Sequence, residues 1–228
     1  MLPQTMVQTV SCSAFFSRDF LALLVLMLAV INGLMLFWRY VTDRPILRVK
    51  AVHPTVYQWF FRLPAGKYQG MPTRKVGILV YFDVINRGRR AVQLESWRLR
   101  IRSKAGQWST LEPLSIPEPS MQLAEAGEKR WPVLGIRSPT NPGTTLVPPG
   151  GSIGGFAYYF AEWWGTPEHD LDIADRKITA IIEVRSILGN HAHAKIILTE
   201  ITLEKAKKMV KGIDTIDSTL TVREEQPE

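Results

Sequence analysis

The chain has 228 residues, 46% of them hydrophobic and 21% charged, with a net charge of +7. This composition excludes a chain that is disordered throughout, because such chains are poor in apolar residues. The single cysteine excludes an intrachain disulfide. We find no helix-turn-helix, zinc-finger or RNA-binding pattern, so the positive charge does not predict a nucleic-acid partner.

An apolar run without a formal charge occupies residues 20–38. A helix of this length is about 28 Å long, which matches the hydrocarbon core of a bilayer. The run predicts one transmembrane helix, preceded by a short N-terminal tail (1–19) and followed by a juxtamembrane linker (39–45). A cleavable signal peptide has a shorter apolar region followed by small residues, whereas Arg39 and Tyr40 follow here. We therefore expect an uncleaved single-pass anchor.

The charges that flank the run predict its orientation. One cation precedes the run, Arg18, and four follow it, namely Arg39, Arg44, Arg48 and Lys50. Lysine and arginine accumulate on the cytoplasmic side of membrane proteins. The bias predicts a cytoplasmic C-terminal domain. The opposite orientation stays open, because anchors with short N-terminal tails also export large domains.

Small residues within the run predict helix association. Ala29 and Gly33 are four residues apart, and Asn32 lies beside them. Such spacing lets two helix backbones approach closely in lipid, where an asparagine can also donate a hydrogen bond across the pair. We expect this face to contact a membrane-protein partner or a second copy of the chain.

After residue 45 the apolar pattern has a period of two, which is typical of β-strands. Turns join the strands, no strand–helix alternation occurs, and prolines interrupt residues 104–150. The pattern predicts a mainly β protein, in which residues 46–203 form an antiparallel immunoglobulin-like β-sandwich. The strands that we expect are 46–52, 76–85, 91–102, 152–160, 178–188 and 191–203.

Two local irregularities are also predicted. In the strand 91–102 the apolar face starts with Val92 and Leu94 but continues with Trp97, a slip of one residue. A β-bulge near Ser96 would absorb this slip without reversing the faces. Further on, Gly189-Asn190 separates two alternating strands and predicts a two-residue type II′ hairpin turn.

The C-terminal segment, residues 204–228, is predicted to be a charged tail that is partly helical and then disordered. Ala206, Val210 and Ile213 fit one face of a helix together with Leu203. The last residues are polar, as in disordered chain ends.

Arginines gather in and after the predicted turn at residues 86–89. Three that alternate along one strand would form a ladder able to hold phosphates or carboxylates. A solvated sheet face is the alternative interpretation. The candidate anion- or lipid-binding residues are Arg87, Arg89, Arg90, Arg98, Arg100 and Arg102.

The segment 156–164 is rich in aromatic residues. Alternation would bury Phe156, Tyr158 and Phe160 and turn the remaining aromatic side chains outward. Exposed adjacent tryptophans at a strand end can contact a partner. A sandwich core with a packed loop is the alternative. The candidate partner-binding residues are Tyr159, Trp163 and Trp164.

Motifs for catalysis are not found: the sequence contains no nucleophile elbow, P-loop, dinucleotide glycine pattern or metalloprotease motif. His191 and His193 would share one strand face, but a metal site needs further ligands, and Lys195 on that face repels a cation. We expect no enzyme activity, cofactor or metal.

These patterns together predict a membrane-anchored, non-catalytic β-sandwich module. We expect it to bind or scaffold a protein partner or anionic lipid at the membrane surface. The alternative is an extracytoplasmic module on a signal anchor that binds a glycan or another envelope ligand.

Overall fold

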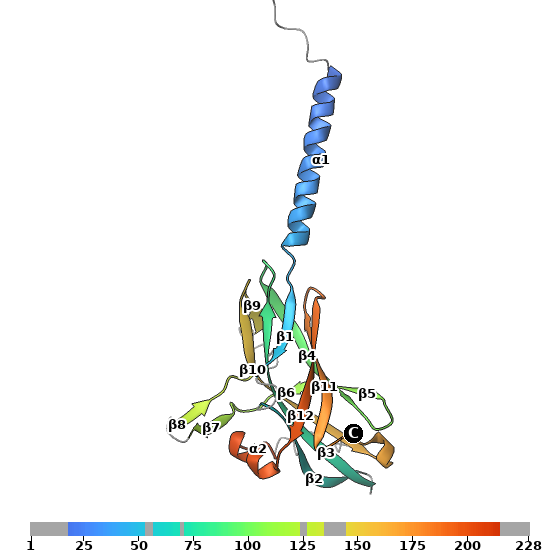
Figure 1. The fold of residues 1–228 in the computed structure, drawn as a ribbon, viewed down its shortest axis with the longest axis vertical. Coiled ribbons are helices and arrows are strands. Elements are labelled where there is room, and N and C mark those ends of the chain that lie inside the picture. The colour runs from blue at the N-terminus through green and yellow to red at the C-terminus, as the bar shows by residue number, and fades with distance from the viewer. Residues whose placement is uncertain (1–17, 53–56, 69–70, 124–126, 135–144, 215–228) are drawn as a thin grey trace, which may run out of the picture. The chain divides into compact units, whose positions relative to one another are not determined.

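The computed structural model describes residues 18–52, 57–68, 71–123, 127–134 and 145–214. The chain divides into two compact units, Met1–Arg44 and Pro45–Glu228, and each is described by itself. Among the described residues, the first unit contains the helix α1, and the second contains all the strands (Figure 1).

α1 spans Arg18–Thr42 and is longer than the predicted run at both ends. Its side chains from residue 20 to residue 42 are exposed, including Leu36 at 68% and Trp38 at 72%. The stretch Phe20–Thr42 is long and apolar enough to cross a bilayer, although a signal sequence near an N-terminus would meet the same criterion.

The second unit is mainly β, as the alternation predicts. Its strands are β1 Leu47–Ala51, β2 Gln58–Tyr68, β3 Met71–Asn86, β4 Val92–Arg102, β5 Trp108–Leu111, β6 Pro113–Leu114, β7 Ser120–Leu123, β8 Gly127–Arg130, β9 Leu146–Val147, β10 Ser152–Trp164, β11 Lys177–Ser186 and β12 His191–Glu200. A 3-10 turn, η2 (Pro167–His169), and the helix α2 (Leu203–Met209) complete it.

The main sheet has two halves. In one half, β3 pairs with β10 along one edge and with β1 and β2 in succession along the other. In the second half, β11 lies between β4 and β12. Among the described strands, the halves share one short ladder, in which Thr199 and Glu200 of β12 run parallel to β2. The other ladders between named strands are antiparallel, as expected.

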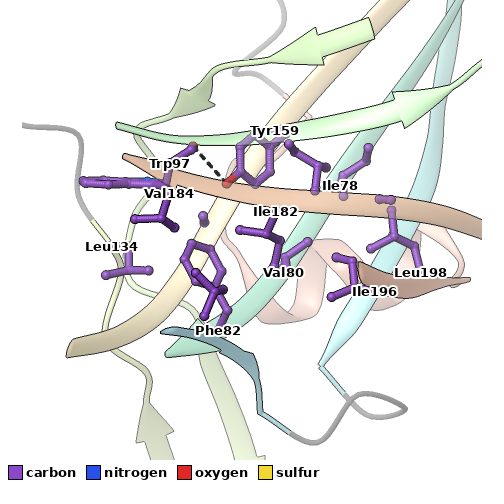
Figure 2. Packing of buried hydrophobic residues seen from close by; sticks show 14 of the residues in the cluster. Ile78, Val80, Phe82, Trp97, Leu134, Tyr159, Ile182, Val184, Ile196 and Leu198 are labelled. Carbon is purple, nitrogen blue, oxygen red and sulfur yellow. Dashed lines mark hydrogen bonds between the residues drawn. The ribbon is translucent and has the colours of Figure 1, made fainter. Parts of the chain in front are cut away.

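The two halves face each other across one hydrophobic core. Period-two alternation turns Val80 and Phe82 of β3, Leu99 of β4 and Ile182 of β11 to the same interior, where each is buried. Burial of one such side chain contributes roughly 1.5–3 kcal/mol. Residues of this cluster labelled in Figure 2 are Ile78, Val80, Phe82, Trp97, Leu134, Tyr159, Ile182, Val184, Ile196 and Leu198.

The β-bulge predicted near Ser96 is confirmed. Arg185 of β11 pairs with Ser96, but the next residue, Ser186, pairs with Leu94. Glu95 is therefore the extra residue, and the buried face continues from Leu94 to Trp97 without reversal.

The type II′ turn predicted at Gly189-Asn190 is wrong. The Gly189 amide donates to the carbonyl of Ser186 at 2.9 Å, and the Ser186 amide donates to the carbonyl of Asn190 at 2.8 Å. These bonds close a three-residue loop that consists of Ile187, Leu188 and Gly189. Gly189 takes a φ of +80°, the left-handed position that follows the turn in such loops. The glycine thus ends the loop instead of opening it.

α2 covers the outer face of β2, β3 and β10. Thr202 caps the helix by accepting a hydrogen bond from the Lys205 amide at 3.4 Å. Ala206, Val210 and Ile213, predicted to share a helical face, are buried in a second cluster with Phe61 and Tyr158. This part of the predicted tail therefore packs on the domain, whereas residues 215–228, for which disorder is predicted, lie outside the described residues.

Candidate functional site

Three loops and the first residue of the second unit meet at one end of that unit (Figure 1). The Asn190 side-chain amide donates to the carbonyl of Pro45 at 3.3 Å. The Arg87 amide donates to the carbonyl of Ile46 at 2.8 Å, and the Asn86 amide donates to that of Gly151 at 3.0 Å. The loops after β3, β9 and β11 therefore lie beside Pro45. We call one set of exposed apolar and arginine residues on these loops, on β9 and beside Pro45 the loop-tip surface: Ile46, Arg87, Arg89, Arg90, Leu146, Ile187 and Leu188.

Asn86 holds these loops together. Its fully buried side chain donates to the carbonyls of Arg90 at 2.7 Å and Val147 at 3.3 Å, and it accepts from the Gly88 amide at 3.0 Å. The sequence predicted the turn at residues 86–89, but it gave no sign that Asn86 would also bind β9. A buried amide whose hydrogen bonds reach two loops fixes their relative positions.

The loop-tip surface combines apolar and positively charged side chains. The exposed fractions are 68% for Leu188, 57% for Ile46, 53% for Leu146 and 48% for Ile187. The arginines at 87, 89 and 90 are also exposed, and no ion pair between described residues includes them. Apolar loop tips beside cations are complementary to a surface with an apolar interior and anionic groups at its boundary.

Arg98, Arg100 and Arg102 share the outer face of β4, as predicted, but two of them have partners in the domain. The Nε of Arg98 lies 2.6 Å from a carboxylate oxygen of Glu112. The Arg100 guanidinium lies 5.3 Å from the centre of the Trp108 ring, a cation–π distance. This face is therefore partly occupied by contacts within the domain.

The structure does not bring the six predicted arginines together. β4 begins beside β9, where Val92 pairs with Val147, and it ends where Arg102 pairs with Trp108. Arg98 lies six residues beyond Val92, which is about 20 Å along a strand. The six arginines therefore form two separate surfaces. The arginines of β4 lie along a strand that leads away from the loop after β3, where the other three are found.

Tyr159 is not a surface residue, so the prediction that alternation turns this candidate partner-binding residue outward is wrong. It is fully buried in the main core, where its hydroxyl donates to the carbonyl of Trp97 at 3.2 Å (Figure 2). Burial raises the pKa of its phenol. The reason is that β10 is covered on both faces: Tyr159 faces the main core, and Phe156 and Tyr158 face the second cluster.

The two tryptophans that end β10 differ. Trp164 is 48% exposed, as predicted. Trp163 is half-buried, packs against the main core and donates from Nε1 to the Asp170 carboxylate at 2.9 Å. The adjacent tryptophans therefore do not form one exposed pair.

His191 and His193 are both exposed on β12, opposite Arg185 and Glu183 of β11. Among the described residues, no three histidine, cysteine, aspartate or glutamate side chains are grouped so that they could hold a metal ion.

Ala29, Asn32 and Gly33 lie within α1 with their neighbours exposed. Association through this face stays a prediction.

Sequence reasoning missed the apolar half of the loop-tip surface. It assigned Ile187 and Leu188 to the end of a strand, although two apolar residues directly before Gly189 were a signal for a protruding loop. It also missed Leu146, whose place beside the other loops depends on the pairing of β9 with β4.

Comparisons with known proteins identify no family. No family model matches the chain, and no curated protein matches it. A crystal structure of a Northeast Structural Genomics Consortium target is similar at a TM-score of 0.28 and 14% identity, covering 69% of this chain and 88% of that one. A Bordetella pertussis protein assigned as ApaA is similar at a TM-score of 0.28 and 11% identity, covering 70% of this chain and 97% of that one.

Proposed function

We propose that this chain is a membrane-anchored, non-catalytic β module whose loop-tip surface docks on anionic lipid. The observation that carries the proposal is the meeting of Pro45, three exposed arginines and four exposed apolar side chains at one end of the domain. The facing halves of the sheet further support the immunoglobulin-like sandwich that the sequence predicts for this module.

The anchor in this proposal is α1. The exposed side chains of this helix from residue 20 to residue 38 carry no charge and are almost all apolar, so lipid solvates the helix better than water does. Asp43 and Arg44 alone separate the helix from Pro45, a reach of roughly 11 Å. This short connection is compatible with docking of the loops bonded around Pro45 on the bilayer that holds α1 in our proposal.

Tethering makes weak contacts sufficient. Each arginine near an anionic leaflet contributes about 1 kcal/mol, so three contribute about 3 kcal/mol. The apolar loop tips add to this where they enter the boundary between headgroups and acyl chains. The tether supplies an effective concentration in roughly the millimolar range, so the loop-tip surface needs little intrinsic affinity.

The outer face of β4 is a weaker candidate for the same lipid. Arg98 would have to exchange its 2.6 Å ion pair with Glu112 for a headgroup, and Arg100 its contact with Trp108. In contrast, the loop-tip arginines form no such pairs with other described residues.

The proposed location of the β domain is cytoplasmic. The cations that follow the apolar run favour that side, and the cytoplasmic leaflet is also the one that carries anionic lipid. A reporter fused after Glu228 tests the orientation. Activity only outside the cytoplasm would instead support the extracytoplasmic ligand-binding module.

The docking itself is tested with an environment-sensitive nitrobenzoxadiazole label. The full chain, with Cys12→Ser, receives a cysteine by Leu188→Cys and is placed in nanodiscs of phosphatidylglycerol or of phosphatidylcholine. We expect brighter, blue-shifted emission in the anionic discs. The matched control is Ile197→Cys, an exposed apolar residue on the outer face of β12. Equal emission from both positions in anionic discs would refute the proposal.

A further inference from the structure

A hollow of about 400 Å³ opens between β2, β3, the end of β10 and the residues after η2. Its apolar walls include Val76, Trp163, Leu171 and Ile173. Val76 lies ten residues before Asn86 on β3, about 33 Å along the strand from the loop-tip surface. We call this cavity the Trp163 hollow, and it is separate from the proposed lipid-docking surface.

A β-bulge opens the hollow. Leu63 of β2 pairs with Lys75 of β3, but the next matched pair is Gly66 with Thr73. Pro64 and Ala65 are therefore both opposite the single residue Arg74. A bulge bends its strand, and bulges often lie at the rims of sheets beside binding sites. Here the bulge residue Ala65 lines the opening with a small side chain.

Asp170 positions the cations at the rim. Its carboxylate accepts the 2.9 Å hydrogen bond from Trp163 and lies 2.9 Å from Nε of Arg74 and 3.6 Å from Nζ of Lys104. The Arg74 Nε is not aligned for a hydrogen bond to it, so this contact is purely electrostatic. Arg74 also donates from Nη2 to the carbonyl of Gly165 at 2.7 Å. The indole and the guanidinium are thus held in place without a ligand.

The rim has an excess of positive charge. Arg62, Arg74, Lys75 and Lys104 line the hollow, and Asp170 is the only carboxylate among its described lining residues. Arg62 and Lys75 have carboxylate partners outside the lining, Glu200 at 3.0 Å and Glu162 at 3.6 Å, respectively. Lys104 is half exposed, and its contact with Asp170 is long, so its ammonium has donors left for another anion.

We propose that the Trp163 hollow binds a small amphiphilic anion, a ring or short aliphatic body with one carboxylate, sulfonate or phosphate group. The apolar body lies against Val76, Leu171 and the Trp163 indole. The anionic group lies at the rim beside the Lys104 ammonium, whose remaining donors face solvent. Mostly apolar walls with a few fixed polar groups are the usual composition of small-molecule sites, and the volume lies within their range.

Isothermal titration calorimetry with naphthalene-2-sulfonate tests this site. The full chain is titrated in phosphatidylcholine nanodiscs, and empty discs supply the blank. We expect saturable binding that Lys104→Glu weakens about tenfold by reversing one contact charge. Ala65→Trp, which fills the opening from the bulge, should abolish it. Circular dichroism confirms that both variants keep the β fold.

The matched control is Lys208→Glu, the same charge reversal at an exposed lysine of α2 that does not line the hollow. It should leave the affinity unchanged. Binding no stronger than to empty discs, or equal affinity in the wild type and the folded Ala65→Trp variant, would overturn the proposal. Because neutral lipid is used, neither result depends on whether the loop-tip surface docks on anionic headgroups.

Discussion

The loop-tip surface and the outer face of β4 each present three arginines, yet the surroundings of these arginines differ. On β4, Arg98 forms a 2.6 Å ion pair with Glu112, and Arg100 stacks on Trp108. At the loop tips, none of the ion pairs between described residues includes an arginine. The number of cations on a surface therefore says less about its binding capacity than the partners that the fold already supplies.

The apolar residues of the two regions also differ in how far other groups of the domain cover them. Trp108 on the β4 side is 42% exposed, but a guanidinium lies over its ring. Ile187 and Leu188 instead project from a hairpin loop whose ends are closed by Ser186 and Asn190. Exposed apolar residues at a loop tip have no cover in the domain, which is why we assign the membrane contact to this end.

The largest predicted effect concerns α1, the proposed membrane anchor of both regions. Leu28→Arg with Ile31→Arg places two charges in the middle of α1, each costing about 3 kcal/mol in lipid. We expect the chain to leave the membrane pellet on alkaline carbonate extraction. The double alanine variant should stay in the pellet. Retention of the arginine variant would contradict a transmembrane α1.

Charge reversal distinguishes the two arginine sets. Changing residues 87, 89 and 90 to glutamate removes about 3 kcal/mol of attraction to an anionic leaflet, more than a hundredfold in the docking equilibrium. The readout is quenching of a label at position 188 by spin-labelled lipid. The matched variant, with Arg98, Arg100 and Arg102 changed to glutamate, should quench like the wild type. A larger loss in the β4 variant would reverse our assignment.

Removing the apolar tip has a smaller effect. Ile187→Ser with Leu188→Ser lowers the apolar area that enters the headgroup boundary, and we expect about 1–2 kcal/mol of lost docking, or roughly tenfold. Hydrogen–deuterium exchange of residues 87–91 in anionic nanodiscs reports it as faster exchange. Ile197→Ser is the control, since this exposed isoleucine lies on the outer face of β12. Unchanged exchange would contradict an apolar contribution to docking and leave the arginines as the source of the attraction to anionic lipid.

The smallest effect is a pH dependence of stability. Burial raises the pKa of Asp83 above its ordinary 3.8, and Lys50 only partly opposes this. The folded state therefore binds the Asp83 proton more tightly than the unfolded state does, and stability falls as pH rises from 3.8 through the folded pKa. Asp83→Asn should remove this fall and raise the melting temperature slightly at neutral pH. The exposed control Asp172→Asn should leave the melting temperature unchanged. A lower melting temperature for Asp83→Asn would contradict the predicted direction of the effect.

The sequence predicted the parts of the fold that depend on local alternation. The faces of β3 and β11 follow from period two, and the slip between Leu94 and Trp97 located a bulge that the pairing of Ser96 with Arg185 confirms. Such features depend on neighbouring residues along one strand, so a single chain segment contains the information.

Features that depend on distant segments were not predicted. Alternation turned Tyr159 outward, because nothing local shows that the second sheet half covers one face of β10 while α2 lies over the other. Likewise, Glu112 comes from the proline-interrupted stretch 104–150, so its pairing with Arg98 was not visible. The loop-tip surface itself exists only because Asn86, Asn190 and the strand order bring separate loops to Pro45.

The most direct test is the depth of two spin labels on the full chain in anionic nanodiscs. Leu188→Cys labels the loop-tip surface, and Thr110→Cys labels β5, which pairs with Arg100 beside the β4 arginines. Accessibility to oxygen and to a water-soluble nickel complex gives the depth of each. Our account predicts position 188 at the boundary between headgroups and acyl chains and position 110 in water. Both labels in water, or position 110 deeper than 188, would contradict it.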